Sequence, residues 1–376
     1  MLTLYIHIPY CVRKCPYCGF YSTPYTPTDA DEFITALRRE AAGYHDEFSN
    51  RIFNTVYIGG GTPTVLSSEQ ITGVLDIVPE HFHIAEHAEF TVEANPNSVT
   101  MRTLSLLLER GVNRLSLGVQ SFSDEDLPAL GRPHTADHAA EAFYLARKAG
   151  FQNIGIDLMY GIPGQTMSRW EATLDRAIEY RPEHISVYGL SLDDGSLFRR
   201  EADAGRFALP DDDCAADMYE YAVTTLTGAG YGRYEISNFA LTGFECRHNM
   251  NYWDRGEYLG LGPGACSFYS NKRYHAIADT KEYARRLSSG ESTAVDVEFP
   301  GLEQASREAI LLNLRTAKGM DLHRYEKEFG ARLFRQLERN MNPLCREGLL
   351  RISEGSVQLT DRGILLSNEA ISRLFA

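Results

Sequence analysis

The first two hundred residues alternate short apolar runs with amphipathic segments, and this alternation narrows the folds open to the chain. Six runs have strand character, at residues 2–8, 54–59, 89–94, 114–119, 153–159 and 184–190. Segments with helical spacing lie between them, at 29–48, 67–78, 100–111, 135–150 and 167–180. Strands that are apolar along most of their length are typical of a parallel sheet covered by helices. We therefore predict an α/β fold, and the pattern leaves an open doubly wound sheet as an alternative to a barrel.

The alternation of predicted strands and helices ends after residue 210. A further helix is predicted at 211–231, ending at Gly228 or Gly230, and a loop-rich aromatic stretch follows at 234–268. From residue 301 the pattern is mostly helical, with two short strands, LLRIS and SVQLT, on either side of Glu354 and Gly355. A helix followed by such a hairpin is the pattern of a winged-helix module. We predict three parts, at 1–232, 233–300 and 301–376.

Composition excludes several classes of function. The net charge of −14 argues against a general nucleic-acid binder, and residues 301–376 carry only about +2. No apolar run approaches the length of a membrane-spanning helix, and the N-terminal MLTLYIHIPYC is predicted to be a strand and not a signal sequence. The seven cysteines are unevenly spaced, which argues against a disulfide framework and favours a reducing cytoplasm.

Three cysteines stand within eight residues, in the stretch CVRKCPYCGF. Cys11, Cys15 and Cys18 follow the spacing C-x3-C-x2-C, and nothing nearby supplies a fourth thiol. A structural zinc site needs four ligands, so zinc would require a distant residue as the last one. A [4Fe–4S] cluster held by three thiolates instead keeps one iron open to an exchangeable ligand. If that ligand is S-adenosylmethionine (SAM), one electron breaks its C–S bond and releases a 5′-deoxyadenosyl radical.

The motifs that follow the cysteines carry a family resemblance. Tyr17 precedes the last cysteine of the motif, and five further motifs follow in order: IGGGTPT (58–64), VEANP (92–96), SLGVQSF (116–122), LGRPH (130–134) and IDLMYGIPGQT (156–166). The chain resembles radical SAM enzymes, and within them the coproporphyrinogen III dehydrogenase-like HemN/HemW family, over nearly its full length. The resemblance implies an incomplete (β/α)6 barrel with a smaller C-terminal helical or winged-helix-like domain. It also implies a [4Fe–4S] cluster on Cys11, Cys15 and Cys18, with SAM bound beside it.

Candidate SAM ligands stand where the predicted strands end. Glu93, Gln120 and Asp157 each close a strand, and the carboxyl ends of parallel strands form the rim where active sites lie. Each of these three residues could instead be a helix cap. In the same way, Gly60 and Gly61 could belong to a plain turn, and Arg132 could form a surface ion pair. The resemblance implies that these residues hold SAM, with Tyr5 near the cluster and Ser191 aligned more loosely. The implied SAM residues are Tyr5, Gly60, Gly61, Thr62, Glu93, Gln120, Arg132, Asp157 and Ser191.

Two features indicate which branch of the family the chain resembles. Phe20 stands where the coproporphyrinogen dehydrogenases carry an additional cysteine, and the motif HNMNYW begins at His248, two residues after Cys246. Both are typical of the HemW group of heme chaperones, and the resemblance implies that His248 contacts heme. From the residue types alone, a thiolate or imidazole could bind iron here and aromatic rings could bind a porphyrin. The alternative is a buried histidine satisfied by hydrogen bonds, with Tyr252 and Trp253 as core.

The implied function is a heme-binding chaperone of tetrapyrrole metabolism that passes heme to acceptor proteins, some of them at a membrane surface. The alternatives are an oxygen-independent coproporphyrinogen III oxidase, which decarboxylates propionates, and another radical SAM enzyme such as a methyltransferase. Phe20 and HNMNYW argue against the oxidase. Arg13 and Lys14 could attract an acidic, flavodoxin-like electron donor. We expect heme or porphyrin as ligand, no nucleic acid, and a monomer or weak homodimer. Cys214, Cys266 and Cys345 are predicted to be inert.

Overall fold

The computed structural model describes residues 1–194 and 196–375, and its centre is a twelve-stranded sheet. Six parallel strands lie side by side in chain order, so the sheet curls in one direction and a doubly wound order is excluded. They are β1 (Leu2–Ile8), β4 (Ile52–Gly60), β5 (His83–Ala94), β6 (Arg114–Gln120), β7 (Ile154–Tyr160) and β8 (His184–Gly189). Among the described residues the two edges of the sheet do not pair with each other. The predicted incomplete barrel is confirmed.

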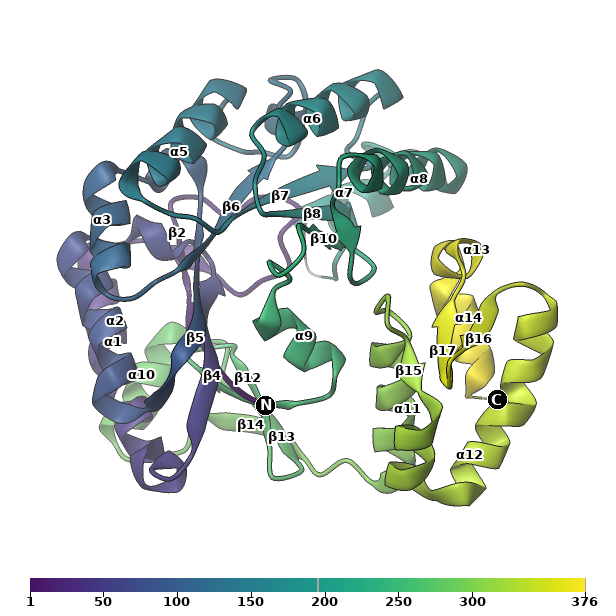
Figure 1. The fold of residues 1–376 in the computed structure, drawn as a ribbon. Helices are drawn as coiled ribbons and strands as arrows, with labels where there is room; N and C mark the ends of the chain where they lie inside the picture. The colour runs from purple at the N-terminus through teal and green to yellow at the C-terminus, as the bar shows by residue number, and fades with distance from the viewer. Residues whose placement is uncertain (195, 376) are drawn as a thin grey trace.

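Helices lie on the outer side of the arc of strands (Figure 1). They are α1 (Pro27–Phe48), α2 (Ser68–His81), α3 (Met101–Glu109), α5 (Ala136–Ala149), α6 (Met167–Glu179) and α8 (Asp212–Gly228). A Ser or Thr hydroxyl caps most of them, which satisfies a backbone N–H in the first turn. The cap of α1 is Thr26, so the helix begins two residues before the predicted start at residue 29, because Pro27 already fits the first helical position.

The stretch predicted to be loop-rich contributes strands to both edges of the sheet. Next to β1 lie β11 (Glu257–Leu261), β12 (Cys266–Tyr269), β13 (Lys272–Ala276) and β14 (Ala294–Glu298), and next to β8 lie β10 (Asn238–Ala240) and β9 (Gly232–Arg233). β11 runs parallel to β1, and β12 to β14 continue antiparallel. Each of these strands is short and Gly262 and Gly264 interrupt the run, so their alternation is hard to recognise in the sequence.

Helix α9 (Arg247–Trp253), which contains HNMNYW, lies inside the arc of strands in Figure 1. Its backbone N–H groups at Arg247 and His248 donate to the buried Glu89 carboxylate on β5, at 2.9 and 3.0 Å. On β1, Thr3 accepts from the Asn251 amide at 3.2 Å. The helix therefore fills the lower interior of the open barrel.

The C-terminal residues have a hydrophobic core of their own, formed between Ala305 and Leu374. The elements are α11 (Leu302–Asn313), β15 (Met320–Asp321), α12 (Leu322–Arg346), β16 (Leu350–Ser353), β17 (Ser356–Leu359), α13 (Asp361–Leu365) and α14 (Ser367–Leu374). The hairpin β16–β17 is the predicted one, and β15 adds a third strand. Asn313 donates to the Trp253 carbonyl at 2.7 Å, so this part holds the end of α9.

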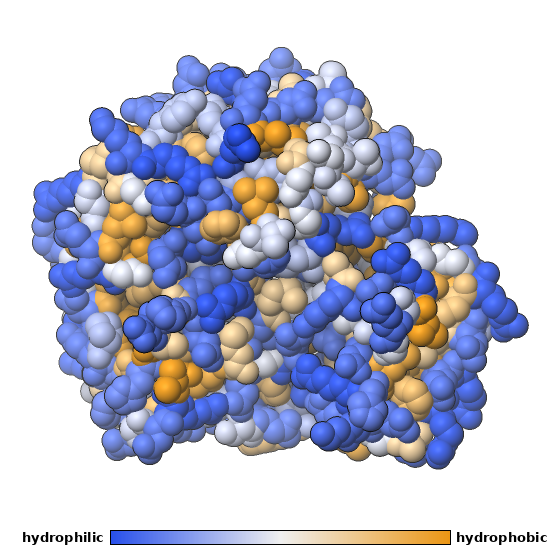
Figure 2. Space-filling model, viewed as in Figure 1, coloured by the Kyte–Doolittle hydropathy of each residue, from blue (hydrophilic) through white to orange (hydrophobic). Residues whose placement is uncertain are grey.

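The face of the molecule in Figure 2 is mainly hydrophilic, with hydrophobic side chains scattered over it. Within residues 1–194 and 196–375, no helix has the length and apolar character needed to span a bilayer.

Candidate functional site

A cavity of about 430 Å³ opens at the carboxyl ends of the parallel strands. The loop that carries the three motif cysteines forms one wall, and the ends of β4 to β8 form the others. Most of the predicted site residues line it, namely Cys11, Cys15, Cys18, Gly60, Gly61, Thr62, Glu93, Gln120, Arg132, Asp157 and Ser191. Tyr5 and His248 are not among its lining residues. Segments far apart in the sequence thus meet around one space, as the rim of a parallel barrel requires.

The cysteine loop is fastened to the barrel near two of its thiols. Thr62 Oγ1 lies 3.6 Å from Cys11 Sγ, and Arg132 Nη1 donates to Cys15 Sγ at 3.5 Å. The loop also closes on itself, since the Cys18 backbone N–H donates to the Cys15 carbonyl. All three thiols are free and partly exposed to the cavity. Three thiols facing one cavity are the donor set that a [4Fe–4S] cluster with an open iron uses.

Within the part of the chain that the structure describes, no group of three or more His, Cys, Asp or Glu side chains is placed to hold a metal ion, the three motif thiols included. The buried Nε of Arg132 has no hydrogen-bond partner, while its Nη2 donates to Asn95 Oδ1 at 2.5 Å and to the Gly118 carbonyl at 2.6 Å. A fixed guanidinium with a spare donor beside the thiols fits a ligand that carries a carboxylate.

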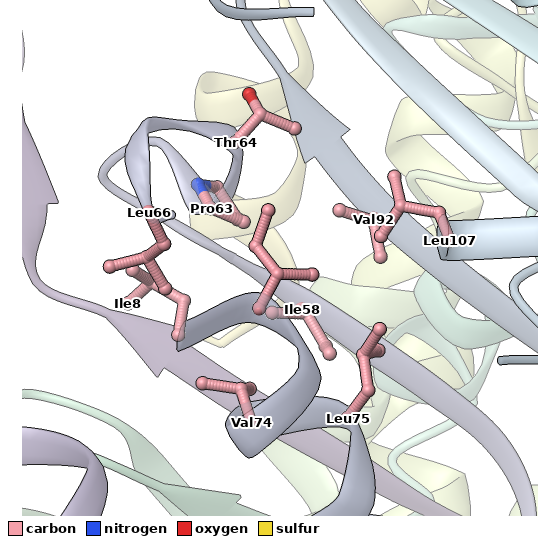
Figure 3. Close-up of a pocket in the computed structure, with 10 residues that line it drawn as sticks. Ile8, Ile58, Pro63, Thr64, Leu66, Val74, Leu75, Val92 and Leu107 are labelled. Carbon is pink, nitrogen blue, oxygen red and sulfur yellow. The ribbon is translucent and has the colours of Figure 1, made fainter. Parts of the chain in front are cut away.

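The Gly-rich turn after β4 supports the cysteine loop from below. The backbone N–H groups of Gly61 and Thr62 donate to the carbonyls of Ile8 and Tyr10, at 2.8 and 2.7 Å. A Cβ at Gly61 would overlap the Tyr10 carbonyl oxygen, so glycine is required for this close approach. Behind the turn, apolar side chains surround a gap of only about 10 Å³ (Figure 3), too small for a ligand. The turn is therefore backed by packed core.

Two half-buried carboxylates line the cavity. Glu93 accepts from the Tyr57 hydroxyl at 2.7 Å and from the Gly60 backbone N–H at 3.1 Å, and Asp157 accepts from Ser116 Oγ at 3.1 Å. Burial raises the pKa of Glu93 to about 7 against these hydrogen bonds, and the neighbouring Asp157 raises it further. Burial also raises the pKa of Asp157. Both carboxyl groups hold spare acceptor capacity for a cationic ligand that carries hydroxyl groups.

Gln120 ends β6 with a φ of 68°, in the left-handed region that few non-glycine residues adopt. The register between β6 and β7 shifts just before it, between Leu117 and Gln120. This irregularity turns the end of the strand at the cavity wall. Backbone strain of this kind concentrates at functional sites, which agrees with the predicted role of Gln120.

Sequence reasoning missed Arg114, which lines the floor of the cavity. It is only 1% exposed, and its Nη1 donates to Thr91 Oγ1 at 3.5 Å. Its positive charge lowers the pKa of both Glu93 and Asp157, against the larger opposite effect of burial. The signal was present in the sequence, because Arg114, Ser116 and Gln120 lie at even spacings along β6. Asn249 of HNMNYW also lines the cavity, although His248 does not.

His248 is buried and both of its ring nitrogens have partners within the protein. Thr55 Oγ1 lies 2.7 Å from Nδ1, and the Tyr252 hydroxyl lies 2.9 Å from Nε2. Burial lowers the pKa of His248 to about 3 and raises that of Cys246 to about 12. His248 therefore has the surroundings of the alternative left open by the sequence, a buried histidine satisfied by internal hydrogen bonds. The expected heme contact at His248 therefore stays a prediction, and it would need α9 to move.

Tyr5 lies on the inner face of β1, below the cavity. Its hydroxyl is 3.0 Å from His7 Nδ1, and its ring lies 6.2 Å from the Tyr57 ring. Since the Tyr57 hydroxyl donates to Glu93, Tyr5 packs against a residue that positions this carboxylate and does not itself line the cavity.

Comparison with known proteins agrees with this geometry. The profile of the Radical SAM superfamily matches residues 5–177, and that of the HemN C-terminal domain matches residues 302–366. These two matches define a radical SAM protein with a HemN-type C-terminal domain.

The chain belongs to the family of proteins named Heme chaperone HemW. It is 35% identical to the member from Bacillus subtilis (strain 168), over 98% of both chains. It is 34% identical to the member from Lactococcus lactis subsp. lactis, over 98% of this chain and 96% of the relative. With the Escherichia coli (strain K12) member it shares 41% identity over 70% of this chain and 69% of that one. The solved structure of coproporphyrinogen III oxidase (HemN) from Escherichia coli superposes with a TM-score of 0.88 at 25% identity, over 100% of this chain and 90% of that one.

Proposed function

We propose that this protein binds heme and passes it to acceptor proteins, on a scaffold that also holds a [4Fe–4S] cluster and SAM. The observation that carries the proposal is the full-length similarity to proteins named heme chaperones, which covers 98% of both chains. The cavity supports it at one residue. Phe20 is 65% exposed and lines the cavity beside the cysteine loop, where the HemN-type pattern would place a further cysteine.

Cys11, Cys15 and Cys18 would hold the cluster through three of its irons. Glu93, Gln120, Asp157 and the turn at Gly60–Thr62 would hold SAM, with Arg132 near its carboxylate. When bound, the cluster and SAM together supply one-electron cleavage of the SAM C–S bond. The residues of the chain orient the cofactor and keep its charged groups out of bulk water.

The second candidate function is SAM-dependent decarboxylation of coproporphyrinogen III. The superposition on the HemN structure over the whole chain favours it, because the same scaffold supports that title activity in the Escherichia coli protein. Identity of 25% in that comparison is lower than the 34–41% shared with the heme chaperones. We therefore place heme handling first.

The partners follow from the same proposal. Acceptor proteins would take heme from the loaded chain, and an electron donor would approach the cluster. Arg13 and Lys14 line the cavity mouth next to Phe20, which suits a donor with an acidic surface such as a flavodoxin. We propose a monomer or weak homodimer.

One anaerobically reconstituted sample separates the two functions. Heme is titrated into one half, and coproporphyrinogen III, SAM and a reductant are added to the other. We expect saturable heme binding and no conversion of the porphyrinogen. Carbon dioxide release that depends on SAM, together with no heme binding, would instead establish the oxidase.

A further inference from the structure

A heme-binding protein offers the iron a thiolate or an imidazole, and the two candidates in and beside HNMNYW are both buried. Cys266 is different, because it is exposed, whereas the other six cysteines, all within the described residues, are buried or half-buried. The sequence alone predicted that it is inert. In the structure, an imidazole and aromatic side chains lie close to this thiol.

Cys266 lies on the inner face of the sheet, the face that α9 covers. In the ladder between β11 and β12, Tyr258 is opposite Phe268, and Cys266 is two residues from Phe268 on the same face. In the ladder between β1 and β11, Tyr258 is opposite Thr3, which accepts a hydrogen bond from Asn251 of α9. Cys266 thus shares the face of the sheet on which α9 lies, and it interacts electrostatically with Tyr252 of that helix.

His275 stands directly across from Cys266 on β13. Its Nδ1 lies 3.9 Å from Cys266 Sγ, and its Nε2 lies 2.8 Å from Asp296 Oδ2. Since an ionised carboxylate can only accept, Nε2 carries the hydrogen and Nδ1 presents its lone pair to the thiol. A thiol, an imidazole and an orienting carboxylate in this order place an acceptor for the thiol proton beside the sulfur. In the ligand-free protein burial raises the pKa of Cys266, so the thiol keeps its proton until a ligand binds.

Aromatic side chains continue from this group toward α9. Tyr252, from HNMNYW, packs edge-on against Tyr258 with ring centroids 4.8 Å apart, and Tyr258 lies 6.2 Å from Phe268. Tyr252 and Tyr258 are half-buried, so part of each ring faces outward. Exposed aromatic surface next to a soft ligand atom suits a flat, apolar ring system that carries a metal.

We propose that Cys266 ligates the iron of heme on the inner face of β11 to β13, with His275 and Asp296 as its positioning residues. This rests on the proposed function, since it takes heme as the cargo. On binding, the S–H bond breaks, its proton passes to Nδ1 of His275, and a sulfur lone pair forms the bond to ferric iron. No electron is transferred. Asp296 stabilises the imidazolium that results, and Tyr252 and Tyr258 contact the porphyrin.

Hemin titration of cluster-loaded protein tests this site, because the cluster occupies Cys11, Cys15 and Cys18. For the unaltered chain we expect the Soret band of a thiolate-ligated ferric heme. Cys266→Ser should lose that band and bind hemin at least about tenfold more weakly, equivalent to about 1.4 kcal/mol. His275→Gln should weaken binding less, and Cys214→Ser, the matched control, should leave both band and affinity unchanged. An unaltered band and affinity in Cys266→Ser would overturn the site.

Alkylation gives a second readout on the unaltered chain. With iodoacetamide, hemin should slow the alkylation of Cys266 and leave the rates at Cys214 and Cys345 unchanged, as peptide mass spectrometry would show. Equal protection of all three, or none, would contradict the proposal. If the chain binds no hemin at all, the proposed function fails with the site, whereas hemin binding with an unaltered band and affinity in Cys266→Ser overturns only the site.

Discussion

Glu93 is the titratable group through which pH should act on SAM binding. Its pKa is raised to about 7 by burial, with Asp157 as a second cause, so in the free protein it is largely protonated below neutral pH. The sulfonium of SAM is a cation and favours the ionised carboxylate. Affinity should therefore rise with pH, by about tenfold between about pH 6 and about pH 8, in step with the ionised fraction of a group of this pKa.

Anaerobic calorimetric titration with SAM across this range measures the effect. Glu93→Gln keeps the shape of the side chain but cannot ionise, so its affinity should be lower and nearly independent of pH. A pH profile that is the same in both proteins would assign the dependence to another group.

Asp157 should contribute to SAM binding and not to the cluster. It accepts a hydrogen bond from Ser116 and lines the cavity from β7, whereas the three thiols belong to the cysteine loop. Asp157→Ala should therefore weaken SAM binding by about 1.5–3 kcal/mol, the range for a hydrogen bond to a charged group. Gln120→Ala should act in the same direction. Iron content measured on the same samples should match that of the unaltered protein, and a joint loss of iron and SAM would indicate that the barrel itself is disturbed.

At the scale of elements, α9 links the inside of the barrel to the C-terminal part. Glu89 accepts hydrogen bonds from backbone N–H groups in the first turn of α9. The His248 ring is hydrogen-bonded to Thr55 and Tyr252, and the Asn313 amide donates to the carbonyl of Trp253 in the last turn. The HNMNYW helix thus makes polar contacts with side chains on the inner face of β1, β4 and β5. We infer that the motif shapes the wall beside Cys266 through Tyr252 and the floor of the cavity through Asn249.

His248→Ala separates packing from heme ligation. It removes two buried hydrogen bonds and leaves Thr55 and Tyr252 unsatisfied, so the free energy of unfolding should fall by about 2–4 kcal/mol. Heme affinity should change little if the histidine is a packing residue. Urea unfolding and hemin titration on one preparation measure both, with the exposed His323→Ala as the control. Intact stability with loss of heme would support direct ligation by His248.

The sequence predicts elements well where a long pattern repeats and poorly where packing decides. β1 and the five parallel strands after it, with their helices, follow from apolar runs and capping residues. β11 to β14 do not, because each is only four or five residues long and is fixed by its neighbour in the sheet. The thiols and the strand-end residues were found from motifs. Arg114 was missed although its spacing along β6 was a signal, whereas Tyr57 and Asn249 were missed because only the fold brings them to the cavity.

At the scale of the whole molecule, an ion-pair group fastens the C-terminal part to the sheet. Glu308 on α11 accepts from Arg255 at 2.9 Å and from Arg273 at 2.8 Å, and Glu298 on β14 binds Arg273 as well. Both guanidinium groups also lie over the Phe268 ring. Since Glu308 is only 17% exposed, its loss would leave two cations poorly compensated.

Glu308→Ala should lower the free energy of unfolding by about 2 kcal/mol, between the values for exposed and buried pairs. The neighbouring pair of Glu303 and Arg332 is exposed, so Glu303→Ala should cost under about 1 kcal/mol and serves as the control. Denaturant unfolding followed by tryptophan fluorescence measures both. Equal effects of the two substitutions would mean that the Glu308 group does not hold the parts together.

The central claim is that the three thiols and the strand ends form one site, for a [4Fe–4S] cluster with an open iron and for SAM. Electron paramagnetic resonance of anaerobically reconstituted, reduced protein tests it most directly, alongside iron and sulfide analysis. We predict about four irons per chain and the spectrum of a reduced [4Fe–4S] cluster, altered by SAM because SAM binds the open iron. Tightly bound zinc without sulfide, or a cluster spectrum that SAM leaves unchanged, would contradict the account.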